Sequence, residues 1–420
     1  MITRRKFFSG AAALAGSSAL LTRIARGAET IAGSPTATAA PRTNTPYAPV
    51  VTPNGASLPW QMVGGVKEFH LVAEPVKREF APGMTVNCWG YNGQTPGPTI
   101  EAMEGDRVRV LVTNHLPEPT SVHWHGVILP NGMDGVGGLT QKHIPPGETY
   151  AYEFTLKKHG VQMYHPHSDE MLQMAMGMEG FFVIHPKGGY AQRVDRHFCI
   201  FLQEWFVEPG SYTPNPNIMT DFNLFTFNSR VWPGTDPLVV KLNQRVRISL
   251  ANLSMDSHPI HFHGHQFWVV GTDGGEIPKE ARWPEVSVNV PPGTTRTVEF
   301  VADNPGDWAF HCHKNHHAMN AMNHNIANLL GTNQKDVSGK ISELIPGYMA
   351  MNSDGMQEMA TMHMGGPKNT LPMMIGEGQF GPIGMGGMFT VLKIREGITS
   401  YEDPGWYQNP TGTVATLASG

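Results

Sequence analysis

The sequence of 420 residues contains only three cysteines and few charged side chains. Three cysteines are too few for a framework of disulfide bonds, which excludes a disulfide-stapled scaffold. Charged residues make up 15% of the chain, whereas they make up about a quarter of an average globular protein. The formal net charge is -5 and no long basic run is present. This gives no electrostatic reason to expect nucleic acid or an anionic membrane as a partner.

Long apolar runs are scarce as well. The one near the N-terminus, Ala11 to Leu21, is too short to span a bilayer comfortably. Arg4 and Arg5 precede it, and this pair resembles the twin-arginine export signal of bacteria rather than an ordinary secretory signal. We predict a signal peptide at residues 1–28 and a disordered linker, rich in Ala, Thr and Pro, at 29–58. The mature protein is then expected to be soluble in the periplasm.

Glycine (47) and proline (34) are abundant, and both disfavour helix interiors. Short strand-like segments bounded by Gly, Pro and Asn follow one another along the chain. This pattern predicts an all-β fold of antiparallel sandwiches or barrels. The clearest segments are Glu68–Val72, Thr85–Cys88, Arg107–Thr113, Thr149–Thr155, Gly180–His185, His197–Leu202, Leu238–Leu242, Arg245–Leu250, Phe267–Thr272, Ser287–Val290 and Thr297–Val301.

An internal repeat divides the chain into two domains. The segment Gly105–Val110 resembles Asn243–Ile248, and a cluster of histidines follows each of them. Such self-similarity indicates two copies of one β domain. A break at Pro186–Gly189 separates them, so we place the first domain at 59–188 and the second at 189–400.

A Met-rich insertion interrupts the second domain at about 323–384. It is rich in Met, Gly, Asn and Pro and is not strand-like, and a final strand-like segment, Phe389–Ile394, follows it. Connections this long are usually functional or disordered. Residues 401–420 form a C-terminal tail.

The 20 histidines of the chain gather in four groups, each with the pattern His-x-His. Residues two apart on a strand share a face, so each pair presents two imidazoles side by side. One pair alone would be read as surface or core histidines. Four pairs, two in each repeated domain, indicate bound metal. The groups are His123–His125, His165–His167, His258–His265 and His311–His313.

Cys312 narrows the choice of metal because it lies between two histidines. On a strand its sulfur points to the face opposite to theirs. A thiolate with two imidazoles and a distant thioether is the ligand set of blue copper. His258 and His317 can supply the imidazoles, and Met322 the thioether. Cys88 and Cys199 have apolar or aromatic neighbours, and we interpret them as inert buried thiols, with a disulfide between them as the alternative.

These groups resemble the copper motifs of multicopper oxidases, the family of laccases, cuprous oxidases and bilirubin oxidase. Asn92–Pro98 resembles the first-domain signature of this family, and the resemblance covers most of residues 60–330. It implies two cupredoxin-like Greek-key β-sandwich domains and four copper ions in each functional site. The ligands that it implies are His258, Cys312, His317 and Met322 for type 1 copper, His123 and His261 for type 2 copper, and His125, His165, His167, His263, His311 and His313 for the type 3 pair.

The sequence departs from the common pattern of the family in its domain number. Most laccases have three cupredoxin domains, whereas the short connection after the first domain leaves no room here for a middle one. The chain therefore resembles the two-domain, small laccase branch. That resemblance implies a homotrimer with each three-copper cluster between neighbouring subunits. Pro166 stands where a first-domain blue-copper cysteine would lie, so we expect no type 1 site there.

Two features of the copper sites remain open in the sequence. Met385 and Met388 precede the final strand, and either is an alternative to Met322 as the axial ligand. Asp134 resembles the family's first-domain acid near the cluster, where a carboxylate could relay protons to reduced oxygen. The alternative interpretation of Asp134 is a turn-forming Asp-Gly pair. Asn315 stands where many relatives have a second acid.

The chain has 24 methionines, many of them in the Met-rich insertion. Thioethers are soft ligands that select Cu(I), so we predict oxidation of Cu(I) by O2 in copper tolerance. Laccase-like oxidation of phenols is the first alternative, and methionines that merely pack are compatible with it. A copper nitrite reductase and a non-catalytic copper-binding protein are the others. The candidate ligands for substrate Cu(I) are Met349, Met351, Met356, Met359, Met362 and Met364.

Overall fold

The structure is a computed structural model, and it describes residues 47–208, 210–319, 340, 343–344, 369 and 376–418. The described chain is nearly all β, which confirms the predicted fold class. Strands alternate with turns throughout, as the abundance of glycine and proline predicts. The named helical elements are short: α1 (Glu170–Ala175), α2 (Asn315–Met319) and the 3-10 turns η1 (Asn131–Met133) and η2 (Lys279–Ala281).

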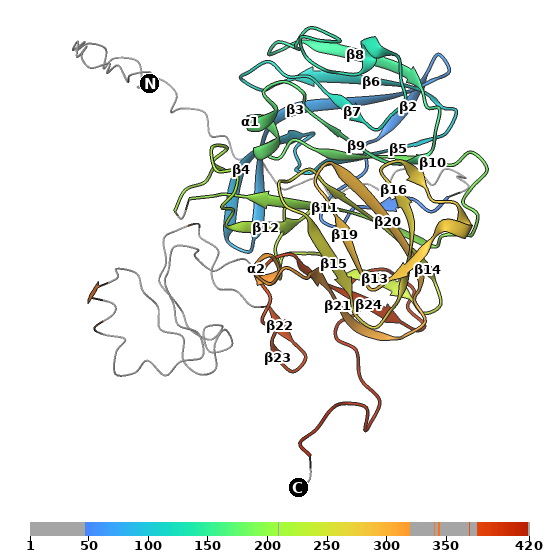
Figure 1. Ribbon diagram of the computed structural model, residues 1–420, viewed down its shortest axis with the longest axis vertical. Helices are drawn as coiled ribbons and strands as arrows, with labels where there is room; N and C mark the ends of the chain where they lie inside the picture. The colour runs from blue at the N-terminus through green and yellow to red at the C-terminus, as the bar shows by residue number, and fades with distance from the viewer. Residues whose placement is uncertain are drawn as a thin grey trace, which may run out of the picture. The chain divides into compact units, whose positions relative to one another are not determined.

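The first sandwich packs a five-stranded sheet against a four-stranded sheet (Figure 1). Alternate residues of the central strands are fully buried, as period-2 patterning requires; Val108, Val110 and Val112 are examples. They pack with Trp124 and Phe182 in one core. The strands of this sandwich are β2 (Trp60–Val63), β3 (Val66–Ala81), β4 (Met84–Tyr91), β6 (Arg107–Asn114) and β8 (Thr149–Thr155) in one sheet and β5 (Gly97–Met103), β7 (His123–His125), β9 (Gly160–His165) and β10 (Gly180–His185) in the other.

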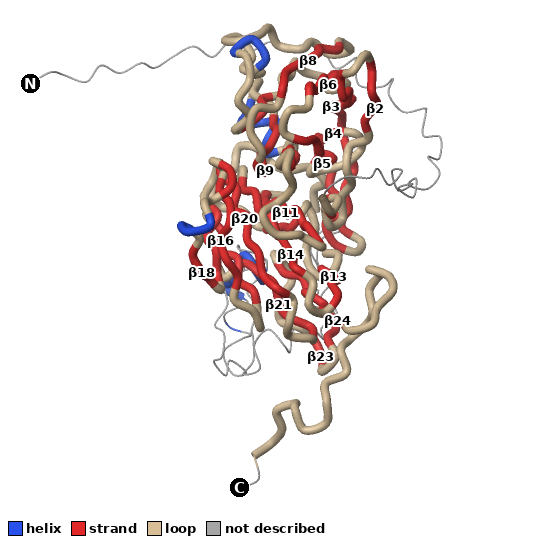
Figure 2. The backbone as a smooth tube through the Cα atoms, turned by 90° about the vertical axis from the view of Figure 1, so that its right-hand side faces the viewer, coloured by secondary structure: helices blue, strands red, loops and turns tan. Residues whose placement is uncertain are grey.

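The second sandwich has the same two-sheet construction (Figure 2). Its core includes Val246, Ile248, Phe262 and Phe310, and Cys312 belongs to the same buried cluster. Its strands are β1 (Val50–Val51), β11 (Arg196–Trp205), β12 (Leu224–Phe227), β14 (Arg245–Asn252), β16 (Phe267–Thr272), β17 (Gly275–Glu276), β18 (Trp283–Glu285) and β20 (Thr294–Val301) in one sheet and β13 (Leu238–Lys241), β15 (His258–Phe262), β19 (Ser287–Val290), β21 (Gly306–Cys312) and β24 (Phe389–Arg395) in the other.

The two sandwiches share one pattern of strand pairing. β6 runs parallel to β3 and antiparallel to β8, and β14 runs parallel to β11 and antiparallel to β20. Matching arginines pair with matching glutamates across these strands: Arg109 Nε donates to Glu153, and Arg247 Nε donates to Glu299. In the other sheets β9 pairs with β7 and β21 pairs with β15. Equivalent strands therefore carry the equivalent His-x-His groups.

The N-terminal segment differs from the prediction. Residues 47–58 are not a disordered linker, because β1 pairs in parallel with β11 of the second sandwich. Val50 packs with Phe181 and Phe201, one from each sandwich. Val50 and Leu58 are buried and Tyr47 stacks on His185, so apolar packing orders this segment. The predicted signal peptide, 1–28, lies outside the described residues.

The Met-rich insertion leaves and re-enters the described chain at one place. Gly387 N–H donates to the carbonyl of Ala318 (2.8 Å), and Met388 N–H donates to that of His317 (3.0 Å). A short hairpin, β22 (Glu377–Gly378) and β23 (Gly381–Pro382), precedes this junction. The described residues on the two sides of the insertion are therefore hydrogen-bonded to each other beside His317.

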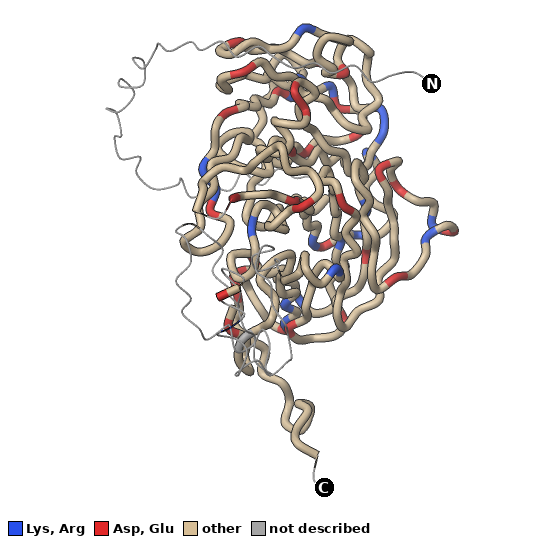
Figure 3. Tube along the Cα trace, turned by 60° about the vertical axis from the view of Figure 1, so that its left-hand side comes forward, with Lys and Arg blue, Asp and Glu red and all other residues tan. Residues whose placement is uncertain are grey.

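The C-terminal tail, predicted at 401–420, is described as far as residue 418 and lies partly against the second sandwich. Asp403 pairs with Lys393 of β24 at 2.5 Å, and Trp406 lies over the same ammonium group. Acidic and basic positions are interspersed along the described chain (Figure 3). Among the described residues, no helix combines the length and the apolar character needed to span a bilayer.

Candidate metal centres

Cys312, His258 and His317 meet inside the second sandwich. Cys312 ends β21, His258 begins β15, and His317 lies in α2. The two Nδ1 atoms are 3.1 Å apart, and Cys312 Sγ lies 3.9 Å from His258 Nδ1 and 3.8 Å from His317 Nδ1. All three side chains are fully buried. The three donor atoms all lie within 4.8 Å of one another, so these residues could hold one metal ion between them.

The protonation of these donors also suits a metal ion. Burial lowers the pKa of His258 well below its usual value, so the imidazole is neutral and offers a lone pair. Burial raises the pKa of the Cys312 thiol to about 12. A thiolate therefore forms there only with a positive charge beside it, which a bound cation supplies.

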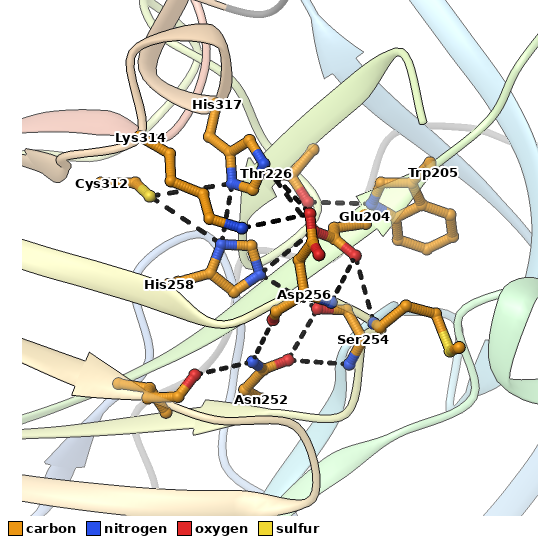
Figure 4. Close-up of polar contacts among 12 residues, drawn as sticks. Glu204, Trp205, Thr226, Asn252, Ser254, Asp256, His258, Cys312, Lys314 and His317 are labelled. Carbon is orange, nitrogen blue, oxygen red and sulfur yellow. Dashed lines mark hydrogen bonds and ion pairs between the residues drawn. The ribbon is translucent and has the colours of Figure 1, made fainter. Parts of the chain in front are cut away.

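Two carboxylates lie behind the imidazoles, on the side away from Cys312 (Figure 4). Glu204 Oε1 is 3.5 Å from His258 Nε2, and Asp256 Oδ2 is 3.6 Å from His317 Nε2. The Glu204 side chain is fully buried, and burial, followed by the charge of Asp256, raises its pKa to about 7. Sequence reasoning missed both acids. The available signal was a glutamate inside the apolar run of β11, where an unpaired charge is costly.

The axial position is described only in part. Met322 lies outside the described residues. Met388 is fully buried in the cluster that contains Cys312, and its carbonyl accepts a hydrogen bond from Cys312 N–H (3.1 Å). Met385 packs instead against a different cluster that contains Trp232. Of the two alternatives to Met322, the structure brings only Met388 to this site.

Four imidazoles of the first sandwich gather at one end of β7 and β9. Pairing of these strands sets His123 opposite His165, while Trp124 between the first two histidines is buried in the core. His125 Nδ1 lies 3.3 Å from His165 Nε2, and the ring centre of His123 lies 5.6 Å from that of His167. Burial lowers the pKa of His165 to about 3, so this ring is neutral.

Hydrogen bonds to carbonyl oxygens fix the orientation of several of these rings. His123 Nδ1 donates to the Asp134 carbonyl at 2.8 Å, and the Asp134 carboxylate lies 3.6 Å from the same atom. His165 Nδ1 donates to the Pro166 carbonyl at 2.9 Å. A carbonyl only accepts, so the proton is on Nδ1 and Nε2 keeps its lone pair. Glu170, which sequence reasoning missed, lies 3.8 Å from His165 Nδ1.

Four further imidazoles gather in the second sandwich, on the face of β21 opposite to Cys312. His261 lies opposite His311 in the pairing of β15 and β21. His263 Nε2 and His311 Nε2 are 3.1 Å apart, and the His313 ring centre lies 5.5 Å from that of His311. The Nδ1 atoms of His261 and His311 donate to the carbonyls of Val286 (2.6 Å) and Cys312 (2.9 Å). Their Nε2 atoms therefore remain available.

Each of these two groups is half of the predicted eight-histidine set. In the described chain, every ring contact among the eight imidazoles stays within its own group. His125 instead lies against the backbone of Gly293 and near the carboxylate of Asp273, in the second sandwich. The structure therefore brings each set of four together and does not join the two sets.

Comparison with known proteins defines the class of these sites. Residues 73–189 match one family model described as multicopper oxidase, and residues 208–329 match a second with the same description. Because the two matches cover more than half of the sequence, the chain belongs to the multicopper oxidase family, in a two-domain form. Proteins of this family are oxidoreductases that use O2, and their cofactors are copper ions in type 1, type 2 and type 3 sites.

Several curated relatives are longer proteins. Copper resistance protein A of Escherichia coli is 42% identical over 138 residues, 33% of this chain and 22% of that protein. A probable nitrite reductase-hydroxylamine oxidoreductase fusion protein of Kuenenia stuttgartiensis is 29% identical over 272 residues, 61% of this chain and 31% of that protein. The chain thus spans about a third or less of these relatives.

One solved structure is similar to this chain over most of the length of both proteins. The blue copper oxidase from Nitrosomonas europaea is 26% identical, with a TM-score of 0.58 over 78% of this chain and 85% of that chain. This similarity extends across both sandwiches and supports the cupredoxin-like fold.

Proposed function

We propose that this protein takes single electrons from a reducing donor at a type 1 copper and passes them to a three-copper cluster that reduces O2 to water. One observation carries the proposal. β21 and the residue that follows it set Cys312 beside His258 and His317 on one face, and His311 and His313 on the other. The backbone from Cys312 to either neighbour provides a path of a few covalent bonds for the electron.

The ligand roles follow the positions of the imidazoles. Copper bound at these sites would supply one-electron redox chemistry at the single site and O2 reduction at the cluster. The protein's own part is to hold neutral imidazoles, fix their orientation through carbonyl acceptors and exclude water from the type 1 site. We propose His258, Cys312 and His317 with Met322 for type 1, His123 and His261 for type 2, and His125, His165, His167, His263, His311 and His313 for type 3.

The separation of the two histidine groups supports a homotrimer. Each group offers four imidazoles, and the cluster needs eight. A first-sandwich group of one subunit that faces a second-sandwich group of its neighbour completes the set, and a ring of subunits closes this head-to-tail contact. The exposed Leu139 near the first group and Val286 beside His261 lie where such a contact would cover apolar surface.

Cu(I) is the donor that we favour. The relative in Escherichia coli is named for copper resistance, and thioethers, which are abundant here, select Cu(I). The proposed substrate ligands Met349, Met351, Met356, Met359, Met362 and Met364 lie outside the described residues, but residues that flank the insertion on both sides meet beside His317. Oxidation of phenols is the second candidate, and export to the periplasm by the twin-arginine route fits either donor.

Two other classes of copper protein, the nitrite reductases and the copper-storage proteins, explain the histidine groups less well. The fusion relative is named in part for nitrite reduction, but a nitrite reductase needs no eight-histidine set. A copper-storage protein needs no cysteine between the two sites. After anaerobic reduction, exposure to air is expected to reoxidise an oxidase rapidly, whereas a nitrite reductase responds to nitrite and a storage protein to neither.

Deletion of residues 345–375 tests whether the Met-rich insertion serves the oxidation of Cu(I). We expect it to lower the rate of Cu(I) oxidation while oxidation of a phenol continues, because only the soft cation uses the thioethers. Steady-state rates with Cu(I), Fe(II) and a phenol would be compared in the two proteins. An unchanged rate with Cu(I) would show that the insertion plays no part in cuprous oxidation.

Replacement of Asp134 by asparagine tests the proton relay. Asparagine keeps the carbonyl that orients His123 but cannot carry a proton, so we expect turnover to fall about 100-fold, a common loss for general acid–base catalysis. Copper content and the rate of anaerobic type 1 reduction are expected to match those of the unaltered protein. Full turnover in the Asp134→Asn protein would leave Asp134 with the turn-forming role alone.

A further inference from the structure

The start of β24 contacts residues of both proposed copper sites. Met388 N–H donates to the carbonyl of His317 (3.0 Å), and the Met388 carbonyl accepts from Cys312 N–H (3.1 Å). Phe389, the next residue, lies opposite His311 in the pairing of β24 with β21, and the centres of these two rings are 6.4 Å apart. A shift of this part of β24 would therefore move ligands of the type 1 copper and of the three-copper cluster together.

An aromatic cluster surrounds Phe389. Its ring packs edge-on against that of Trp232, with the ring centres 5.0 Å apart, and Val391 and Trp406 belong to the same cluster. Because alternate residues of a strand share a face, Phe389 and Val391 both lie on the face of the sheet that carries His311. Trp406 comes from the C-terminal tail, so a segment that follows the last strand completes the packing around Phe389 (Figure 1).

Residues 401–407, which we call the C-terminal strap, bind to two buried cations of β24. Lys393 Nζ pairs with Asp403 at 2.5 Å and lies 4.6 Å from the ring centre of Trp406. The guanidinium of Arg395 donates to a backbone carbonyl of the strap at 2.7 Å. Lys393 and Arg395 are only 4% and 8% exposed. Attraction between a cation and an aromatic ring is stronger where water is excluded, so these contacts fix the ring of Trp406 on the strand.

We propose that Trp406 is a positioning residue for both copper sites. Lys393 holds its ring against β24, and the ring limits the movement of Phe389 within the aromatic cluster. Met388, which adjoins Phe389, then keeps its two hydrogen bonds to residues of the type 1 site. The proposal rests on the proposed copper ligands and applies whichever donor the enzyme oxidises. It gives the C-terminal strap a part in the function, although the strap supplies no ligand.

Replacement of Trp406 by alanine in the full-length, copper-loaded protein tests this role. We expect the amides of residues 387–389 to exchange hydrogen about tenfold faster, because their local opening no longer has to displace a ring held by a cation. The type 1 absorption is also expected to shift, because the carbonyl of Met388 accepts from Cys312 N–H. Trp406→Phe keeps an aromatic ring beside Lys393 and is expected to restore both properties. Hydrogen exchange would be followed by mass spectrometry and the type 1 site by visible absorption.

The matched control is Tyr401→Ala. Tyr401 belongs to the same strap and its ring centre also lies beside a cation, 3.8 Å from Arg196, but among the described residues it stands outside the aromatic cluster. We expect this control to leave the exchange of the same amides and the type 1 absorption unchanged. If Trp406→Ala does not fold, Asp403→Asn permits the same measurements, since the Asp403 side chain is 53% exposed and its loss weakens only the pairing with the strand. Changes in the same direction but smaller are then expected.

The outcomes separate the role of Trp406 from the proposed function. Unchanged hydrogen exchange at residues 387–389, or an unchanged type 1 absorption, in Trp406→Ala would overturn the positioning role. Equal changes in Trp406→Ala and Tyr401→Ala would also overturn it, because loosening of the whole strap would then explain them without any special part for one ring. Absence of blue absorption from the unaltered, copper-loaded protein would instead refute the proposed copper ligands.

Discussion

Replacement of Cys312 by serine is expected to abolish the intense thiolate-to-copper absorption near the red end of the visible spectrum and to stop turnover with every donor. The sulfur lies 3.8 and 3.9 Å from the two imidazole nitrogens, and the same residue separates His311 from His313. Exchange of the sulfur for a hydroxyl oxygen therefore removes a ligand, and with it the metal–sulfur bond that would connect the type 1 site to the covalent path along the backbone. We expect a loss of about 100-fold or more, since even partners outside the ligand shell account for about 10–100-fold.

The chain supplies a matched control for this variant. Cys88 is free and buried, and burial raises the pKa of its thiol well above the usual range. We expect Cys88→Ser to keep the absorption and the turnover, with at most a loss of stability from a buried hydroxyl. Absorption spectra and steady-state rates of the two copper-loaded variants would show whether the effect is specific to Cys312. Undiminished blue absorption in Cys312→Ser would refute the type 1 assignment.

The sequence predicts the paired histidines well because their spacing is a local property. A residue and its second neighbour share a face of a strand wherever the strand lies, so His311 and His313 separate from Cys312 in any β fold. The internal repeat can also be recognised from short stretches of sequence, because Arg109 and Arg247 occupy matching positions in them. In the structure both arginines pair with matching glutamates. The fold class and the side-by-side placement of the paired histidines therefore follow from periodicity, whereas the assignment of each histidine to a copper site rests on the resemblance to the family.

The acids around the sites come close to the histidines only through tertiary contacts. The spacing of residues in the sequence therefore does not predict them. Glu204 lies at the end of β11, 54 residues before His258, and only the packing of the sheets brings them together. Glu170 looks like an ordinary first-turn acid of a helix, yet it lies beside His165. The sequence does not predict β1 either, because two consecutive valines are too short a segment to show the alternation of a strand. Free Cys88 and Cys199 agree with the prediction of buried thiols rather than that of a disulfide.

Two inactive variants are expected to restore activity when they are made together. His125→Ala removes a ligand from the first-sandwich group, and His263→Ala removes one from the second-sandwich group. Each variant alone lacks complete clusters. In a mixed ring of three, the intact first group of a His263→Ala subunit meets the intact second group of a His125→Ala subunit at one contact out of three. Activity per subunit is therefore expected to reach about a third of that of the unaltered protein.

The control is co-expression of His125→Ala with His165→Ala, whose lesions lie in the same group. No contact between these subunits has an intact first group, so no activity is expected. Rates and copper content would be measured on mixed assemblies isolated through two different affinity tags. If instead each chain completed its own cluster, the His125→Ala and His263→Ala mixture would stay as inactive as the control. Restoration in the first mixture alone requires that the cluster form between chains, since no chain in it carries eight intact histidines.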